Sequence, residues 1–148
     1  MIRPASASDE PCIRACATLA FARYVPVIGR KPAPMVADFA SQIAAGHIYV
    51  ATNEEGHVLG YISFYETTGQ MHLESVAVLP SVVGQGVGKE LMPYCEQAAR
   101  LRGLGSVCLY TNERMTENLA MYQKLGYVEV TRRVEDGFHR VYFEKSVA

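Results

Sequence analysis

The first 46 residues combine two helical patterns with a proline-rich segment. Residues 1–5 predict a short first strand. Ser8 and Asp9 can cap a helix, whose apolar residues Ile13, Cys16, Ala17 and Ala20 follow helical spacing. Residues 24–34 hold three prolines and a glycine, which predicts a structured loop rather than a helix. A second helix is expected over residues 35–45, ended by Gly46.

The rest of the chain reads mostly as strands, with two further helices. Runs of alternating apolar and polar residues, bounded by turn residues, predict strands over 47–52, 58–65, 71–79 and 106–111 and a final hairpin over 127–134 and 138–145. Helical spacing predicts helices over 86–102 and 116–125. This order predicts a single sheet of the mixed α/β or α+β class.

Composition supports one folded domain over residues 1–148. The chain has 148 residues, of which 49% are apolar, so intrinsic disorder is not expected. Lys and Arg number 14, Asp and Glu number 15, and the formal net charge is −1. A nucleic-acid partner is therefore not expected, because such proteins usually carry a strong basic excess.

The sequence predicts neither a membrane partner nor a metal site. No apolar run approaches the roughly 20 residues that cross a bilayer. The first six residues lack the apolar core of a signal peptide, so we expect a cytoplasmic protein. The cysteines do not have the spacing of a zinc site.

A glycine-rich turn carries the most chemical information. Glycines at 84, 86 and 88 separate a predicted strand from a predicted helix, and backbone N–H groups in that position bind anions such as phosphate. The P-loop pattern fails, because Gly88-Lys89 is followed by Glu90 rather than Ser or Thr. The dinucleotide pattern G-x-G-x-x-G fails because its third glycine is missing.

The stretch from Val76 to Leu91 resembles the cofactor motif of the GCN5-related N-acetyltransferase (GNAT) family. That motif is Arg or Gln, two residues, Gly, one residue, then Gly or Ala, and Gly86 and Gly88 match it. The Arg or Gln position is Val83 here, which removes a charged phosphate contact but keeps a backbone N–H. A glycine-rich turn without a ligand is the plain structural alternative.

A second stretch, from Asn118 to Tyr127, resembles the family's segment of a tyrosine, three residues, Gly and an aromatic residue. In many members an Asn stands seven residues before that tyrosine, Tyr122 here, but this chain has Met115. Asn118 lies one helical turn before Tyr122 and is a possible substitute.

The resemblance implies a fold and a co-substrate. The fold is α+β, with a twisted, mostly antiparallel sheet of about six to seven strands, splayed at the cofactor site and flanked by about four helices. The co-substrate is acetyl-CoA, with no metal. The resemblance assigns these residues to its binding: Val76, Ala77, Val78, Val83, Gly84, Gln85, Gly86, Val87, Gly88, Lys89 and Asn118.

The implied reaction is direct attack of a primary amine on the acetyl-CoA thioester in a ternary complex. By resemblance, Tyr122 protonates the departing sulfur, and the Val78 N–H is a candidate donor to the oxyanion. Glu74 is a candidate base, and His72 shares its face of the strand if alternation holds. A core aromatic residue and a solvated strand residue are the alternatives for Tyr122 and Glu74. A nucleophilic cysteine is not supported, because no cysteine has a basic neighbour in the sequence.

The acceptor is not identified by the sequence. Tyr24, Arg30 and Tyr65 could line its pocket, although a solvated loop also explains Arg30. The hairpin over residues 136–140 could reach the site, cover a second copy in a homodimer, or be a plain edge hairpin. The acceptor is expected to be a small-molecule or peptide amine. Two rival functions remain: an acetyl-CoA sensor without catalysis, motivated by Val83 and Met115, and a nucleotide hydrolase, which the P-loop mismatch disfavours.

Overall fold

Seven strands form one sheet in the order β1-β2-β3-β4-β5-β7-β6 in the computed structural model, which describes residues 1–148. All neighbouring strands are antiparallel except β4 and β5, which are parallel. The strands are β1 (Ile2–Pro4), β2 (Ile48–Thr52), β3 (Val58–Thr67), β4 (Gln70–Val78), β5 (Ser106–Asn112), β6 (Val128–Glu135) and β7 (Phe138–Ser146). The expectation of a mostly antiparallel sheet of six to seven strands is confirmed.

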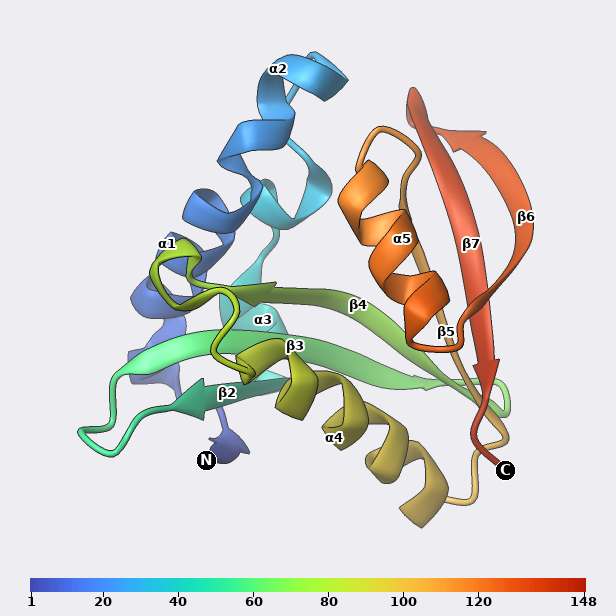
Figure 1. The fold of residues 1–148 in the computed structure, drawn as a ribbon. Coiled ribbons are helices and arrows are strands. Elements are labelled where there is room, and N and C mark those ends of the chain that lie inside the picture. Colours follow the sequence, from blue (N-terminus) through green and yellow to red (C-terminus); the bar gives the residue numbers. More distant parts are fainter.

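Helices cover both faces of the sheet (Figure 1). They are α1 (Glu10–Phe21), α2 (Val25–Ile28), α3 (Phe39–Ala44), α4 (Val87–Leu101) and α5 (Thr116–Lys124). One buried cluster joins α4 and α5 to the sheet and includes Leu91, Leu109 and Phe143. A second cluster joins α1 and α3 to the other face and includes Ile13, Phe39 and Tyr61.

Two helix predictions in the N-terminal region were wrong. Val25–Ile28 forms a short helix where a loop was expected, because Pro26 occupies its first turn, where a missing N–H removes no helical bond. The next helix begins at Phe39 rather than near residue 35. The side chain of Asp38 accepts a hydrogen bond from the Ser41 N–H at 3.1 Å and so fixes this start.

The helical stretch Ala7–Ile28 is long and apolar enough, by length and composition, to span a membrane, contrary to the expectation that no such run exists. In the fold it packs on the sheet, where Ile13, Cys16 and Phe21 are buried. A helix that packs in the core of a folded domain can be equally long and apolar.

The sheet opens between β4 and β5. These strands pair only at Gln70–Ser106, Met71–Val107 and His72–Cys108. Beyond these pairs, β4 pairs only with β3, and β5 pairs only with β7. The predicted splay is therefore present.

A β-bulge lies at the point where the sheet opens. Ser63 pairs with Ser75 and Phe64 pairs with Leu73, so Glu74 has no partner on β3. A bulge bends its strand and re-aims side chains. The bulge therefore puts Glu74 where β4 leaves β5.

Gly60 on β3 is required by a close approach to the end of β4. A Cβ at this position would lie 2.7 Å from the Ala77 carbonyl oxygen and 3.3 Å from Val87 Cγ1. We predict that Gly60→Ala lowers the free energy of unfolding by about 1–3 kcal/mol, as overpacking does. Gly105→Ala is the matched control, because a Cβ there meets nothing within 4 Å. Equal denaturation midpoints for the two variants would contradict this packing.

Candidate active site at the opening between β4 and β5

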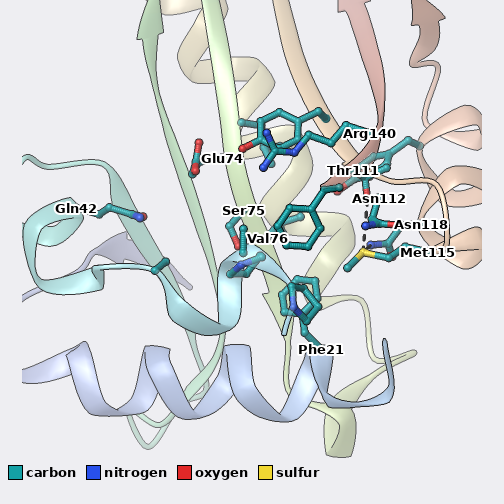
Figure 2. Close-up of a pocket in the computed structure, with 18 residues that line it drawn as sticks. Phe21, Gln42, Glu74, Ser75, Val76, Thr111, Asn112, Met115, Asn118 and Arg140 are labelled. Carbon is teal, nitrogen blue, oxygen red and sulfur yellow. Dashed lines mark hydrogen bonds between the residues drawn. The ribbon is translucent and has the colours of Figure 1, made fainter. Parts of the chain in front are cut away.

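A pocket occupies the opening in the sheet (Figure 2). Leu73 to Val76 of β4 and Tyr110 to Asn112 of β5 form its two sides. Met115, Asn118 and Tyr122, at the start of α5 and along it, line one end. The remaining lining residues come from α1, the loop between α2 and α3, α3 itself, and β7: Phe21, Pro32, Ala33, Pro34, Ala37, Gln42, Phe138 and Arg140.

Tyr122 presents an unpaired hydroxyl to this pocket. The residue is 5% exposed, and its ring packs against Tyr127 and Phe143. The hydroxyl makes no hydrogen bond within the chain, although no buried polar atom in the protein lacks a partner, so it is open to the pocket. Burial, together with the nearby Tyr24, raises the pKa of Tyr122 above its usual value.

Glu74 lies on the opposite strand and is held by His72. His72 Nε2 lies 3.0 Å from Glu74 Oε2, so the two side chains share a face as alternation predicted. This hydrogen bond holds the pKa of Glu74 below its usual range against the effect of burial, and the charges of Arg140 and His47 act in the same direction. Glu74 lines the pocket, whereas His72 does not.

His72 also has a partner on β5 that the sequence could not reveal. Cys108 Sγ lies 3.8 Å from His72 Nδ1, across the last β4–β5 pair. Burial alone would lower the pKa of His72, but its hydrogen bonds with Cys108 and Glu74, and their charges, raise that pKa to about 9. No group of three or more His, Cys, Asp or Glu side chains is arranged to hold a metal ion.

The backbone of β4 presents free N–H groups to the opening. The Leu79 N–H donates to the Leu59 carbonyl on the β3 side at 2.9 Å. N–H groups alternate sides along a strand. The backbone N–H groups of Val78 and Val76 therefore point away from β3 and toward the opening. The backbone N–H of Ala77 points toward β3, and its side chain is buried on the α1 face. Ala77 therefore does not face the opening, as its predicted role in cofactor binding would require.

The glycine turn leads into α4 at the end of β4. Gly84 and Gly86 both have φ of +88°, a conformation that favours glycine, and their N–H groups have no partner in the chain. Gly86 is the N-cap of α4 without a side-chain cap, so the first N–H groups of the helix, from Val87, Gly88 and Lys89, remain available to an anion.

Two of the predicted donors in this turn are already used. The Val83 N–H donates to the Pro80 carbonyl at 3.4 Å, and the Gln85 N–H donates to the Val82 carbonyl at 3.1 Å. Both bonds follow from the 3₁₀ turn at Pro80–Val82, which the sequence analysis did not include. The expectation that the Val83 N–H stays free was therefore wrong.

Met115 replaces an amide side chain with a buried sulfur. Its Sδ accepts hydrogen bonds at 3.5 Å from Thr111 Oγ1 and from Asn118 Nδ2. The second bond holds Asn118 at the pocket wall, one turn before Tyr122 (Figure 2).

None of the three predicted acceptor residues lines the pocket. Tyr24 is buried, and its hydroxyl donates to Glu117 on α5 at 3.1 Å. Arg30 donates to the Asp136 carbonyl and stacks 3.5 Å from the centre of the Phe138 ring. Tyr65 stacks on the ring of His47 and contacts the ring of His72 at a tilt. The hydrogen bonds of Tyr24 and Arg30 thus connect the N-terminal elements to α5 and to the β6–β7 turn.

Tyr110 and Gln42 are pocket residues that sequence reasoning missed, and Arg140 of the C-terminal hairpin lines the pocket with them. The hairpin over residues 136–140 was considered for the site, but alternation alone could not separate that role from an ordinary edge hairpin. Asp136 and Gly137 both have positive φ and form a two-residue turn between β6 and β7. On its other side, β7 pairs with β5, which places Arg140 opposite Asn112.

Comparisons with known proteins agree with this architecture. The family model described as "Acetyltransferase (GNAT) family" matches residues 14–127. The curated "Uncharacterized N-acetyltransferase YjgM" of Escherichia coli (strain K12) is 29% identical over 89 residues, which cover 57% of this chain. The match spans 53%, or about half, of that protein's length.

Solved structures share the whole fold at low identity. The ribosomal-protein-S18-alanine N-acetyltransferase of Escherichia coli has a TM-score of 0.79 at 19% identity, over 100% of this chain and 94% of that one. Ard1 of Thermoplasma volcanium has a TM-score of 0.80 at 20% identity, over 100% and 97%. PaiA N-acetyltransferase of Thermoplasma acidophilum, solved in complex with coenzyme A, has a TM-score of 0.79 at 17% identity, over 99% and 98%.

The family model covers residues 14–127, which is most of the chain. The chain therefore belongs to the GNAT family of acetyl-CoA-dependent acetyltransferases.

Proposed function

We propose that this protein transfers the acetyl group of acetyl-CoA to a primary amine by direct attack in a ternary complex. The observation that carries the proposal is one pocket, lined by both Glu74 and Tyr122, at the opening between β4 and β5. A carboxylate on one side and a free hydroxyl on the other suit a reaction that removes a proton from an amine and supplies one to a thiolate.

The residues of the opening fit acetyl-CoA. The free N–H groups of Gly84 and Gly86, with the uncapped start of α4, would hold the pyrophosphate, and the exposed Lys89 lies in the same first turn. The N–H groups of Val76 and Val78 would pair with the pantetheine arm as an added strand does. The Val78 N–H would donate to the thioester oxygen, where charge develops during attack.

Tyr122 is the proposed proton donor to the departing sulfur. A free tyrosine has a pKa near 10 and a thiol near 8.5, so full transfer from Tyr122 to a thiolate in water costs about 2 kcal/mol. Burial raises the pKa of Tyr122, and it raises that of a buried thiol in the same direction because both conjugate bases are anions. The mismatch therefore stays small, and the hydroxyl stabilises the sulfur by donating to it.

Glu74 rather than His72 is the proposed base. Glu74 lines the pocket, and its lowered pKa keeps it ionised at neutral pH. His72 has a pKa raised to about 9, so it is an imidazolium there and has no free lone pair to take a proton. Its role is to position Glu74 by donating from Nε2.

The acceptor is a small-molecule or peptide amine. The Escherichia coli structural neighbour is named for the alanine of ribosomal protein S18, and a protein N-terminus is one acceptor to include. A turnover screen of acetyl-CoA over amino acids, polyamines, aminoglycosides and peptides, followed by release of free CoA, tests the proposal. Binding of acetyl-CoA without turnover of any amine would instead support the sensor function.

We predict that Gly86→Ala weakens acetyl-CoA binding about tenfold or more, because the strained turn misplaces N–H donors to a charged phosphate. Gly103→Ala is the matched control: its φ of +72° is strained by the same substitution, but it lies at the far end of α4. Acetyl-CoA should raise the melting temperature of the wild type and of Gly103→Ala much more than that of Gly86→Ala. An equal rise in melting temperature for both variants would show that the glycine turn does not bind acetyl-CoA.

We predict that Tyr122→Phe lowers kcat by about 100-fold or more, the usual contribution of a general acid. The melting temperature should stay nearly unchanged, because the hydroxyl has no hydrogen-bond partner in the chain. Tyr94→Phe makes the same chemical change on α4, where the ring packs against Tyr49 and Phe64, and should leave kcat unaltered. An unchanged kcat in Tyr122→Phe rules out the acid role.

The charge of His72 predicts a pH-dependent contribution to stability. Its folded pKa of about 9 exceeds the unfolded value of about 6.5, so the stabilisation is complete below pH 6.5 and is lost as pH rises through 9. Wild type should exceed His72→Gln by about 1–3 kcal/mol in free energy of unfolding at pH 6, with a smaller difference at pH 9.5. His57→Gln, at an exposed histidine, is the control. A difference that is constant with pH would show that folding does not shift the pKa of His72.

A further inference from the structure

Arg140 is a nearly buried cation that lacks hydrogen bonds. Its side chain is 14% exposed, and none of its five N–H donors has a hydrogen-bond acceptor in the chain. Its guanidinium lies 4.4 Å from the centre of the Tyr110 ring and 5.6 Å from that of Phe138. No buried side-chain nitrogen in the protein lacks a partner, so these unbonded donors are open to the pocket, where they can bind an anion.

The chain itself does not supply that anion at bonding distance. The nearest carboxylate oxygen, Glu135 Oε1, is 3.7 Å from Arg140 Nη1, and it already accepts a hydrogen bond from the Tyr142 hydroxyl. Glu74 influences Arg140 only through its field, without a hydrogen bond or an ion pair between them. The guanidinium edge therefore faces the pocket that Arg140 lines.

The pocket thus carries opposite charges on its two walls. Figure 2 shows Glu74 on the β4 side of the opening and Arg140 on the side of β5 and β7. β5 lies between the two strands that carry these residues, and β4 no longer pairs with β5 beyond His72, so the two backbones are separated by the opening itself. Both side chains line the same pocket, so one ligand that carries both charges could meet the two of them.

The surfaces around this charged pair are apolar. Phe21, Pro32, Pro34 and Phe138 line the same pocket. Arg30 packs on the Phe138 ring and donates to the Asp136 carbonyl, and so it fixes the loop between α2 and α3 against the β6–β7 turn. These residues give an apolar wall for the rest of a ligand.

We propose that the acceptor is a small amino acid-like molecule with an apolar side group, whose amine lies at Glu74 and whose carboxylate is bound by Arg140. The inference rests on the proposed acetyl transfer and names its substrate class. The guanidinium fork would bind the carboxylate through two parallel hydrogen bonds. A carboxylate close to the amine would then be required for good binding, which a polyamine cannot offer.

The test compares three ligands with one side group: leucine, leucinamide and 3-methylbutylamine, followed by the same series for phenylalanine. Each is measured for binding to the CoA-loaded protein by calorimetry and for acetylation with acetyl-CoA. For at least one series we expect kcat/KM for the amino acid to exceed that for its amide and its amine by about 10- to 100-fold, the value of a charge-assisted hydrogen bond. Equal values, or binding and turnover only with polyamines or other ligands without an acid group, overturn the inference and leave the proposed acetyl transfer intact.

Variants of Arg140 separate recognition of the carboxylate from a structural role. Arg140→Gln should lower kcat/KM for the amino acid about 10- to 100-fold, mainly through KM, and should not lower that for the amine. Arg133→Gln is the matched control, because Arg133 pairs with Arg140 across β6 and β7 but does not line the pocket. A uniform loss over all ligands would overturn the specificity role. Absence of turnover with every amine, while acetyl-CoA still binds, would instead reject the proposed function.

Discussion

The site depends on parallel pairing between β4 and β5 that lasts for only three residue pairs. An unpaired backbone N–H in a buried sheet is costly, so an interior strand normally keeps both neighbours. Here each strand keeps one neighbour beyond the opening, β3 for β4 and β7 for β5. The groups left unpaired at Val76 and Val78 are the ones that an extended ligand can satisfy.

β4 contributes to both buried clusters, whereas β5 contributes to only one of them. Ala77 of β4 packs with the N-terminal helices, whereas Leu109 of β5 packs with α4 and α5. The hydrogen bond from Tyr24 to Glu117 and that from Arg30 to the Asp136 carbonyl connect the two sides. These residues were predicted to contact the acceptor. In the structure their polar groups are used to hold the elements around the pocket together.

Local signals in the sequence predicted the fold well. Alternation located all the strands to within about two residues, and glycine spacing with the resemblance located the turn and Tyr122. The failures have physical causes that a local pattern does not contain. The 3₁₀ turn that occupies the Val83 and Gln85 N–H groups depends on the carbonyls of Pro80 and Val82, and the residues facing the pocket from β7 depend on strand order. The contact between His72 and Cys108 joins residues 36 apart in sequence, so no spacing rule could reveal it.

Amide hydrogen exchange measured by NMR, with and without coenzyme A, tests the opening most directly. The N–H groups of Val76, Val78, Gly84 and Gly86 should exchange fast in the free protein and slow markedly when coenzyme A is added. Ala77 and Leu79, which point toward β3, should be protected in both states. Coenzyme A that binds without slowing exchange at these four positions, or that protects a different surface, would contradict the account.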